Sequence, residues 1–525
     1  MHSSDSNLQS RRAFLRRSGE LALTGTALPF ALNLAAMGEA AAFNAPGTDY
    51  KALVCVFMFG GNDYGNTVIP YDDVSYDKYH AIRGGGATGR GGAGIAIAQA
   101  DLTPTLLVPN AAPLDVLGQP RQYALHPSMT GLAGLFNAGK AAVQLNVGPL
   151  IKPLTRTQYN NSNRALYPRP PQLFSHNDQQ SIWQSSRPEG SKIGWGGNMG
   201  DLVVPPNPSL NSNSLFTGIS VSGNAVFLSG DTALQYQVST NGAIKIRPAT
   251  DNTVYGSTTV RSTLNTLIQQ VAGTHKLEND YNTVTKRALA SEAAITSALA
   301  LSDPTKGGAA LTTTFGTDSL SQQMKMVARL INGRALLGNR RQVFFVSIGG
   351  FDLHDNLISQ HPTILGRVSA AMTSLYNATV EMGVATQVTS FTASDFGRTL
   401  VSNGDGADHG WGSHHLVVGG AVNGKAFYGF PPPVNVTDGT VVNGVRTYMP
   451  EEQWHVGQGR LLPTTSVDQY AATMAKWFGV DVAEMPGVLP NISNFGAAAA
   501  GSAAALVLNP GNPGAAYPQD LGFMV

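Results

Sequence analysis

Short, continuous apolar runs alternate with stretches of helical periodicity along most of the chain. The strongest runs predict buried strands at residues 52–59, 140–147, 343–348, 387–392 and 415–420. Helical patterns lie between or beside them, at residues 128–137, 320–337, 362–382 and 466–478, with Ser466 as the expected N-cap of the last helix. Strands that are apolar on both faces and alternate with helices are typical of parallel sheets. The pattern therefore predicts an α/β fold, a mostly parallel sheet with helices on both faces.

Two stretches depart from this alternation. Residues 207–262 are rich in Ser, Asn, Thr and Gly, and we expect an insertion of short strands or loops there. Residues 496–518 are of low complexity, dominated by Ala, Gly and Pro, and we expect them to be mobile. The predicted organisation is one α/β domain over residues 44–495, followed by the low-complexity segment and tail at residues 496–525.

The first 43 residues have the three parts of a secretory signal. Residues 10–16 (SRRAFLR) match the twin-arginine pattern S-R-R-x-F-L-K with Arg in the last position. An apolar stretch follows, and residues 39–42 (EAAA) suit a signal peptidase. The stretch is short for a membrane span of ~20 residues, although a retained anchor or a basic amphipathic helix is the alternative. We therefore expect the twin-arginine translocase of a bacterium to export the folded chain to the periplasm or beyond, with no stable membrane span after processing.

Composition narrows the classes of function. The net charge is +1, and no cluster of Lys and Arg occurs beyond the signal, so nucleic acid is not an expected partner. The single cysteine, Cys55, lies in an apolar run and is expected to be a buried thiol. A chain without disulfides is compatible with folding in the reducing cytoplasm before export.

Polar clusters follow the predicted strands, at the strand ends where an open α/β sheet binds its ligands. The first is residues 60–63 (GGND), in which Asp63 offers oxygen atoms to a cation, although these residue types also form ordinary turns. The second is residues 349–356 (GGFDLHDN). Its Asp352 and His354 are two positions apart, so on an extended segment both point the same way and could reach one metal ion.

Two later clusters add further candidates. In residues 394–399 (SDFGRT), Asp395 could bind metal and Arg398 could hold phosphate or sulfate, although a surface ion pair worth ~0–1 kcal/mol is the alternative. Residues 405–415 (DGADHGWGSHH) contain three of the 11 histidines of the chain. Imidazole with carboxylate is a ligand set for Zn²⁺ and related ions, which makes His409 and His414 candidate ligands.

A weaker candidate begins a predicted helix at residues 174–178 (FSHND). Ser175 could simply cap that helix. It could also act as a nucleophile, because the helix dipole favours an anion at this end.

Taken together, these motifs resemble the domain-of-unknown-function 1501 family. The segments that carry the resemblance are residues 59–72 (FGGNDYGNTVIPYD), 349–356, 395–399, 408–422 (DHGWGSHHLVVGGAV), 466–480 (SVDQYAATMAKWFGV) and 490–495 (PNISNF). The resemblance implies a fold related to the alkaline phosphatase and sulfatase superfamily. Members of that superfamily use one or two metal ions to cleave phosphate or sulfate esters.

The resemblance also implies roles for individual residues. Asp63 corresponds to the metal-binding Asp of the first strand, Asp352 with His354 to the second Asp/His pair, and Asp395 to the Asp of the late S-D-H-G motif. The final His ligand is His409 or His414, and the candidate nucleophile is Ser175.

The chain departs from the superfamily pattern at several of these positions. The usual D-x-x-x-H pair is here D-x-H, with Asn356 where the His would fall, and the usual D-H is Asp395-Phe396. The C/S-x-P-x-R motif of formylglycine sulfatases is absent. We therefore expect an exported hydrolase of phosphate or sulfate esters, acting on a small molecule or a polymer with Zn²⁺, Mn²⁺ or Ca²⁺. The alternative is a non-catalytic envelope protein, with a binding or structural role, on the same fold.

Overall fold

The computed structural model describes most of the chain beyond its N-terminal segment. The described residues are 49–86, 89–204, 210–212, 214–270 and 275–525. The predicted signal peptide, residues 1–43, lies outside them. Among the described helices, none is both long and apolar enough to cross a membrane.

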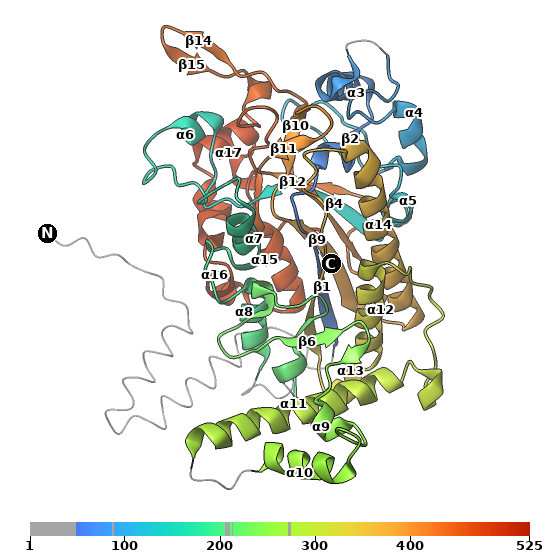
Figure 1. The fold of residues 1–525 in the computed structure, drawn as a ribbon. Helices are drawn as coiled ribbons and strands as arrows, with labels where there is room; N and C mark the ends of the chain where they lie inside the picture. The colour runs from blue at the N-terminus through green and yellow to red at the C-terminus, as the bar shows by residue number, and fades with distance from the viewer. Residues whose placement is uncertain (1–48, 87–88, 205–209, 213, 271–274) are drawn as a thin grey trace, which may run out of the picture.

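A ten-stranded mixed sheet forms the centre of the molecule (Figure 1). Its strands run in the order β13-β4-β12-β9-β1-β8-β5-β6-β7, with β16 paired to β4. β1 lies parallel between β8 and β9, so that Cys55 has Phe345 on one side and Phe391 on the other. The strands are β1 (Lys51–Met58), β4 (Ala141–Gly148), β5 (Gly218–Ser220), β6 (Tyr236–Ser239), β7 (Gly242–Ala243), β8 (Arg341–Ile348), β9 (Val388–Ser394), β12 (Ser413–Gly419), β13 (Phe427–Tyr428) and β16 (Thr465–Ser466).

Helices cover both faces of this sheet, which confirms the predicted α/β class. Alternate residues of β1 enter two different cores, with Val54 in one and Cys55 in the other. The first core includes helices α5 (Thr130–Asn137), α12 (Ser319–Asn332) and α14 (Leu357–Glu381). The second includes α7 (His176–Ser185), α8 (Trp195–Val203) and α15 (Val467–Phe478). Because each central strand is buried on both sides, it reads as a continuous apolar run in the sequence.

Helix ends follow local capping chemistry where the sequence contains it. Ser466 is the N-cap of α15, as predicted, and its hydroxyl accepts a hydrogen bond of 3.0 Å from the backbone N–H of Gln469. The Gln469 side chain accepts in return from the backbone N–H of Ser466 at 2.9 Å, which completes a capping box. α14 begins at Leu357, five positions before the predicted start, and contains Pro362.

Three two-stranded sheets are separate from the central sheet. They are β2 (Val68–Pro70) with β3 (Tyr123–Leu125), β10 (Arg398–Ser402) with β11 (Ala407–His409), and β14 (Thr440–Val442) with β15 (Val445–Thr447). α10 (Thr258–Gln269) and α11 (Lys276–Ala300) lie at the opposite end of the molecule, at the bottom of Figure 1. Within residues 207–262, where short strands or loops were expected, the short strand β5 joins the central sheet beside β8.

The low-complexity segment is folded, and the expectation of a mobile segment was wrong. It contains α17 (Ala503–Leu508), flanked by the short helical turns Gly496–Ala499 and Pro513–Ala515. Ala505, Leu508 and Tyr517 are buried in a cluster that also includes Trp411. Small apolar side chains suited to close packing produce the same composition bias as a flexible linker, which explains the error.

Candidate metal centre

Segments that are distant in sequence meet beyond the carboxyl ends of the central strands. Asp395 follows β9 directly, and Asp352 lies four residues beyond the end of β8. The backbone N–H of Gly60, just after β1, donates a hydrogen bond of 3.1 Å to Oδ2 of Asp395. His176 is the first residue of α7, and His409 is the last residue of β11. The fold thus places carboxylates and imidazoles together at the edge where α/β sheets bind ligands.

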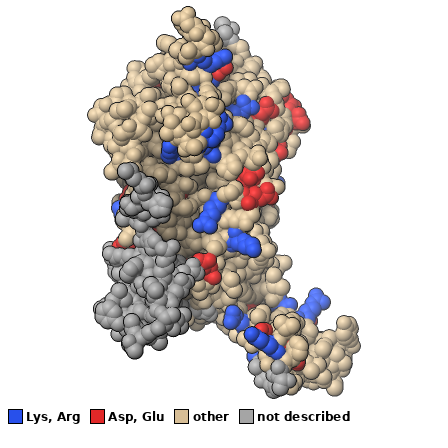
Figure 2. Space-filling model, turned by 90° about the vertical axis from the view of Figure 1, so that its left-hand side faces the viewer, with Lys and Arg blue, Asp and Glu red and all other residues tan. Residues whose placement is uncertain are grey.

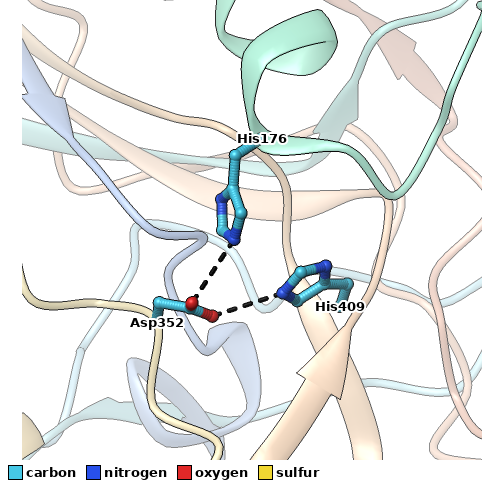
Figure 3. A group of neighbouring side chains, drawn as sticks. All are labelled: His176, Asp352 and His409. Carbon is cyan, nitrogen blue, oxygen red and sulfur yellow. Dashed lines mark hydrogen bonds and ion pairs between the residues drawn. The ribbon is translucent and has the colours of Figure 1, made fainter.

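Three of these side chains form a group that could hold a metal ion. Ligand atoms of His176, Asp352 and His409 all lie within 4.8 Å of one another. These three side chains are therefore close enough together to share one metal ion. In Figure 3 the two imidazoles point toward opposite oxygens of one carboxylate. Nε2 of His176 is 3.4 Å from Oδ2 of Asp352, and Nε2 of His409 is 3.3 Å from Oδ1. The group is open to solvent, because the Asp352 side chain is 47% exposed.

Hydrogen bonds at Nδ1 orient both histidines toward Asp352. His176 Nδ1 donates to Oδ2 of Asp395 at 2.7 Å, and His409 Nδ1 donates to the carbonyl of Phe174 at 2.8 Å. Metal-binding histidines usually donate their second ring N–H to a carboxylate or a carbonyl in this way. Among the described residues, the buried Nε2 of His176 forms no hydrogen bond, and its 3.4 Å contact with Oδ2 of Asp352 is an ion-pair distance. The donor set and its orientation therefore fit a divalent ion that accepts nitrogen and oxygen ligands.

His354 lies beside this group, as the D-x-H spacing predicted. Its Nε2 is 3.0 Å from Nε2 of His409 and 3.2 Å from Oδ1 of Asp352. On the other side of the ring, Nδ1 lies 3.4 Å from Oδ1 of Asp408. His354 is thus a second imidazole facing the same carboxylate oxygen as His409, with its own carboxylate partner.

The surroundings of each group set its charge. The hydrogen bond to Asp395 raises the pKa of His176, and burial opposes this effect. Burial lowers the pKa of His409, and the hydrogen bond to the Phe174 carbonyl opposes it. Burial works to raise the pKa of Asp352, but the hydrogen bond and charge of Arg398 outweigh it and hold that pKa below its usual value. These shifts favour the anionic Asp352 and the neutral His409 that ligation needs, whereas the raised pKa of His176 favours its protonated form, from which a metal ion would displace the Nε2 proton.

Arg398 forms a buried anchor for Asp352. Its side chain is fully buried and pairs with Asp352. Its guanidinium also donates to three backbone carbonyls, those of Gly61 at 2.9 Å, Gly60 at 2.7 Å and Ala407 at 2.5 Å. The sequence indicated that Arg398 could contact a phosphate or sulfate directly. Its buried position instead favours a role in holding Asp352 in place.

Two other predicted ligands lie outside the three-residue group. Asp63 is buried and forms an ion pair with the buried Arg83, and its Oδ1 also accepts from the N–H of Gly65 at 3.2 Å. His414 is buried, and its Nδ1 accepts a hydrogen bond of 3.0 Å from the N–H of Asn146. Burial lowers the pKa of His414 to about 3. Neither side chain is brought to the group by this fold.

Ser175 and His176 begin α7 side by side. Ser175 is half-buried at the N-cap position, and its hydroxyl forms no capping hydrogen bond. It lies in the chain between Phe174, whose carbonyl binds His409, and His176. His176 was not recognised as a ligand from the sequence. The signal available in the sequence was its position at a predicted helix start, directly after the candidate nucleophile Ser175.

Comparisons with known proteins identify a family but no activity. The profile of a family described as "Protein of unknown function (DUF1501)" matches residues 50–443. No curated protein matches the sequence. A solved structure of Ps i-CgsB in complex with k-i-k-neocarrahexaose is 9% identical, covering 85% of this chain and 77% of that one, with a TM-score of 0.29. That likeness is too distant to carry an argument. The family match spans most of the chain, and the protein belongs to the DUF1501 family.

Proposed function

We propose that this protein is a metal-dependent hydrolase of phosphate or sulfate esters. The observation that carries the proposal is the convergence of His176, Asp352 and His409 within 4.8 Å, with both imidazoles oriented through Nδ1. A purely structural cluster does not require two Nε2 atoms aimed at one carboxylate. The proposed relation to the alkaline phosphatase and sulfatase superfamily is further support and rests on the motif resemblance alone.

The ligands of the ion would be His176, Asp352 and His409, with His354 beside them. When bound, a divalent ion supplies positive charge to the ester oxygen and lowers the pKa of an attacking hydroxyl or water. Asp395 holds His176 in the orientation that presents Nε2, and Arg398 keeps Asp352 ionised and in place. Zn²⁺ and Mn²⁺ suit this nitrogen-rich set better than Ca²⁺, which prefers oxygen ligands.

Two groups are assigned to the reaction itself. Ser175, next to His176, is the proposed nucleophile, since its hydroxyl is not engaged in capping the helix. His354 is the proposed proton carrier, because its side chain is 41% exposed and Asp408 faces its Nδ1. A Ser175→Ala variant that kept full turnover, with no covalent intermediate trapped in the wild type, would transfer the nucleophile's role to water.

The first experiment is elemental analysis of the mature protein. We compare the wild type with Asp352→Asn/His409→Ala after loading with Zn²⁺, Mn²⁺ or Ca²⁺, then screen aryl phosphate, phosphodiester and aryl sulfate substrates. His275→Ala is the matched control, because His275 is exposed at the start of α11. We expect stoichiometric metal and turnover in the wild type and in His275→Ala. The double variant should lose both. No metal in any sample would favour a non-catalytic envelope protein.

Export by the twin-arginine translocase is part of the same proposal. Residues 10–16 carry the paired arginines that this route reads. Replacing Arg11 and Arg12 with Lys should keep the protein in the cytoplasm, whereas Arg16→Lys should leave export unchanged. Equal fractions of both variants in the periplasm would argue against the route.

A further inference from the structure

Arg460 lies at the rim of the candidate metal centre with its terminal nitrogens available. Its Nε donates a hydrogen bond of 2.8 Å to the carbonyl of His409. Its guanidinium lies over the ring of Phe174, 5.5 Å from the ring centre. Both contacted residues adjoin or belong to the metal-binding group, so Arg460 is anchored beside it. Within the described chain its two Nη atoms form no hydrogen bond or ion pair.

Two more cations lie over tyrosines that pack near the segment of His409. The Arg169 guanidinium lies 4.6 Å from the centre of the Tyr159 ring, and Lys152 Nζ lies 5.9 Å from that of Tyr167. Tyr159 is close enough to Arg460 to act on it electrostatically. The two tyrosines pack against one apolar cluster, which contains Trp411. Through these two tyrosines, Arg169 and Lys152 are placed near the cluster of Trp411, which lies two positions from His409 in the sequence.

We call this surface the cationic strip and define it as Lys152, Tyr159, Tyr167, Arg169, Phe174 and Arg460. Neither Lys152 nor Arg169 forms an ion pair with a carboxylate in the described part of the chain. Asp408 is the acidic side chain that acts on Arg460, and it also faces His354. Figure 2 views the side of the molecule that carries α6 (Arg156–Asn160) and α7, and it shows Lys and Arg gathered toward the upper part of this face.

We propose that the cationic strip binds a sugar polymer that carries several sulfate or phosphate groups, one of which lies in the metal centre. This inference rests on the proposed function and names its substrate class. Arg460 would hold the group next to the ester that reacts, because a guanidinium binds such anions through paired hydrogen bonds. Arg169 and Lys152 would hold groups farther along the polymer.

The chemistry of the strip favours a sugar chain over a nucleic acid. Each aromatic ring already has a cation over it, whereas single-stranded nucleic acids need open aromatic faces for their bases. The net charge of the chain is +1, and three cations provide little of the counterion release that drives nucleic-acid binding. A sparsely charged strip with aromatic edges suits a chain whose anionic groups are separated by neutral rings.

The test measures binding separately from catalysis. The mature protein in a chelator is titrated with dextran sulfate, uncharged dextran and single-stranded DNA at low salt. The strip variant is Lys152→Gln/Arg169→Gln/Arg460→Gln. The control is Lys245→Gln/Lys276→Gln/Lys306→Gln, which removes three exposed cations outside the strip. Thermal melting checks that both variants fold.

We expect dextran sulfate to bind much more tightly than dextran, and the strip variant to bind at least about tenfold more weakly than the control. Asp352→Asn should retain this binding and lose turnover, so that failure of the strip and failure of the hydrolase are distinguishable. Equal losses in both triple variants, or strip-dependent binding of DNA as tight as that of dextran sulfate, would overturn the inference.

Discussion

Nδ1 of His176 donates a hydrogen bond of 2.7 Å to Oδ2 of Asp395, from a residue 219 positions away in the sequence. The same Asp395 oxygen accepts from the N–H of Gly60 and from the side chain of Gln180. Asp395 is fully buried, so these donors take the place of water. The pair joins the end of β9 to the start of α7 and turns Nε2 of His176 toward Asp352. In this structure Oδ2 of Asp395 orients the candidate ligand His176, while its Oδ1 is buried without a hydrogen-bond partner among the described residues, so that metal binding by Asp395 itself stays a prediction.

Asp395→Asn should lower metal affinity by about 10- to 100-fold, the usual cost of losing a partner behind a metal-binding histidine. The substitution keeps the size of the side chain and removes the charge that supports His176. Calorimetric titration with Zn²⁺ measures the change. Asp178→Asn, in the first turn of the same helix, is the control and should bind like the wild type. Unchanged affinity in Asp395→Asn would mean that His176 is not a ligand.

Arg398→Gln and Arg83→Gln should each lower the free energy of unfolding by about 3 kcal/mol, because each leaves buried acceptors without their cation. Arg398 is bound to Asp352 and Arg83 to Asp63, and both guanidiniums are buried. Only Arg398→Gln should also weaken metal binding, since Asp63 lies outside the three-residue group. Urea unfolding and Zn²⁺ titration give the two readouts. Loss of metal in Arg83→Gln would return Asp63 to the ligand set.

Gly60→Ala should abolish metal binding through the position of Asp352. Gly60 has a φ of +115°, and a Cβ there would lie 2.4 Å from the backbone nitrogen of Asp352. Because that atom is backbone, the loop carrying Asp352 must move. Gly404→Ala is the matched control, since Gly404 has a φ of +139° and open space around a Cβ. It should cost about 1–3 kcal/mol in backbone strain and keep the metal. Equal metal affinities in the two variants would contradict the prediction.

As pH rises, the free energy of unfolding of Asp468→Asn should increase relative to that of the wild type. Burial raises the pKa of Asp468 to about 6, although hydrogen bonds from Asn491 and Ser186 oppose the shift. The folded state therefore holds its proton more tightly than the unfolded state, whose reference value is 3.8. Stability from this group is complete below pH ~4 and is lost as pH rises to ~6, by at most about 3 kcal/mol.

Melting curves of the wild type and Asp468→Asn between pH 4 and pH 7 test this linkage. The difference in unfolding free energy should shift toward the variant with increasing pH, because Asn resembles the protonated acid and does not titrate. Other titrating groups cancel in the difference. Parallel pH profiles of the two proteins would show that Asp468 titrates normally.

Leu508→Ala should lower the free energy of unfolding by about 2–5 kcal/mol, as expected for a buried leucine. Leu508 is 2% exposed in α17, within the segment whose composition resembles a linker. Its neighbour Val507 is 41% exposed, so Val507→Ala should change stability by less than about 1 kcal/mol. Equal, small effects of both substitutions would mean that this segment does not contribute to the folded core.

Much of the sheet could be predicted because its information is local. The central strands β1, β8 and β9 are buried on both faces, and burial on both faces requires an unbroken apolar run that is visible in the sequence. The capping box that begins α15 is local as well, since Ser466 and Gln469 are three residues apart. The D-x-H spacing brought Asp352 and His354 together for the same reason.

By itself, the sequence therefore determined the α/β class, the strands that lead to the candidate site and the segments from which Asp352, His354 and His409 come. Only the tertiary structure decided which polar residues face one another. It brought His176 from α7 to Asp352, joined Asp63 to Arg83, and buried Arg398 under the group. These pairings depend on how separate chain segments pack, and the identity of a charged residue does not reveal whether its partner will be a metal or another side chain.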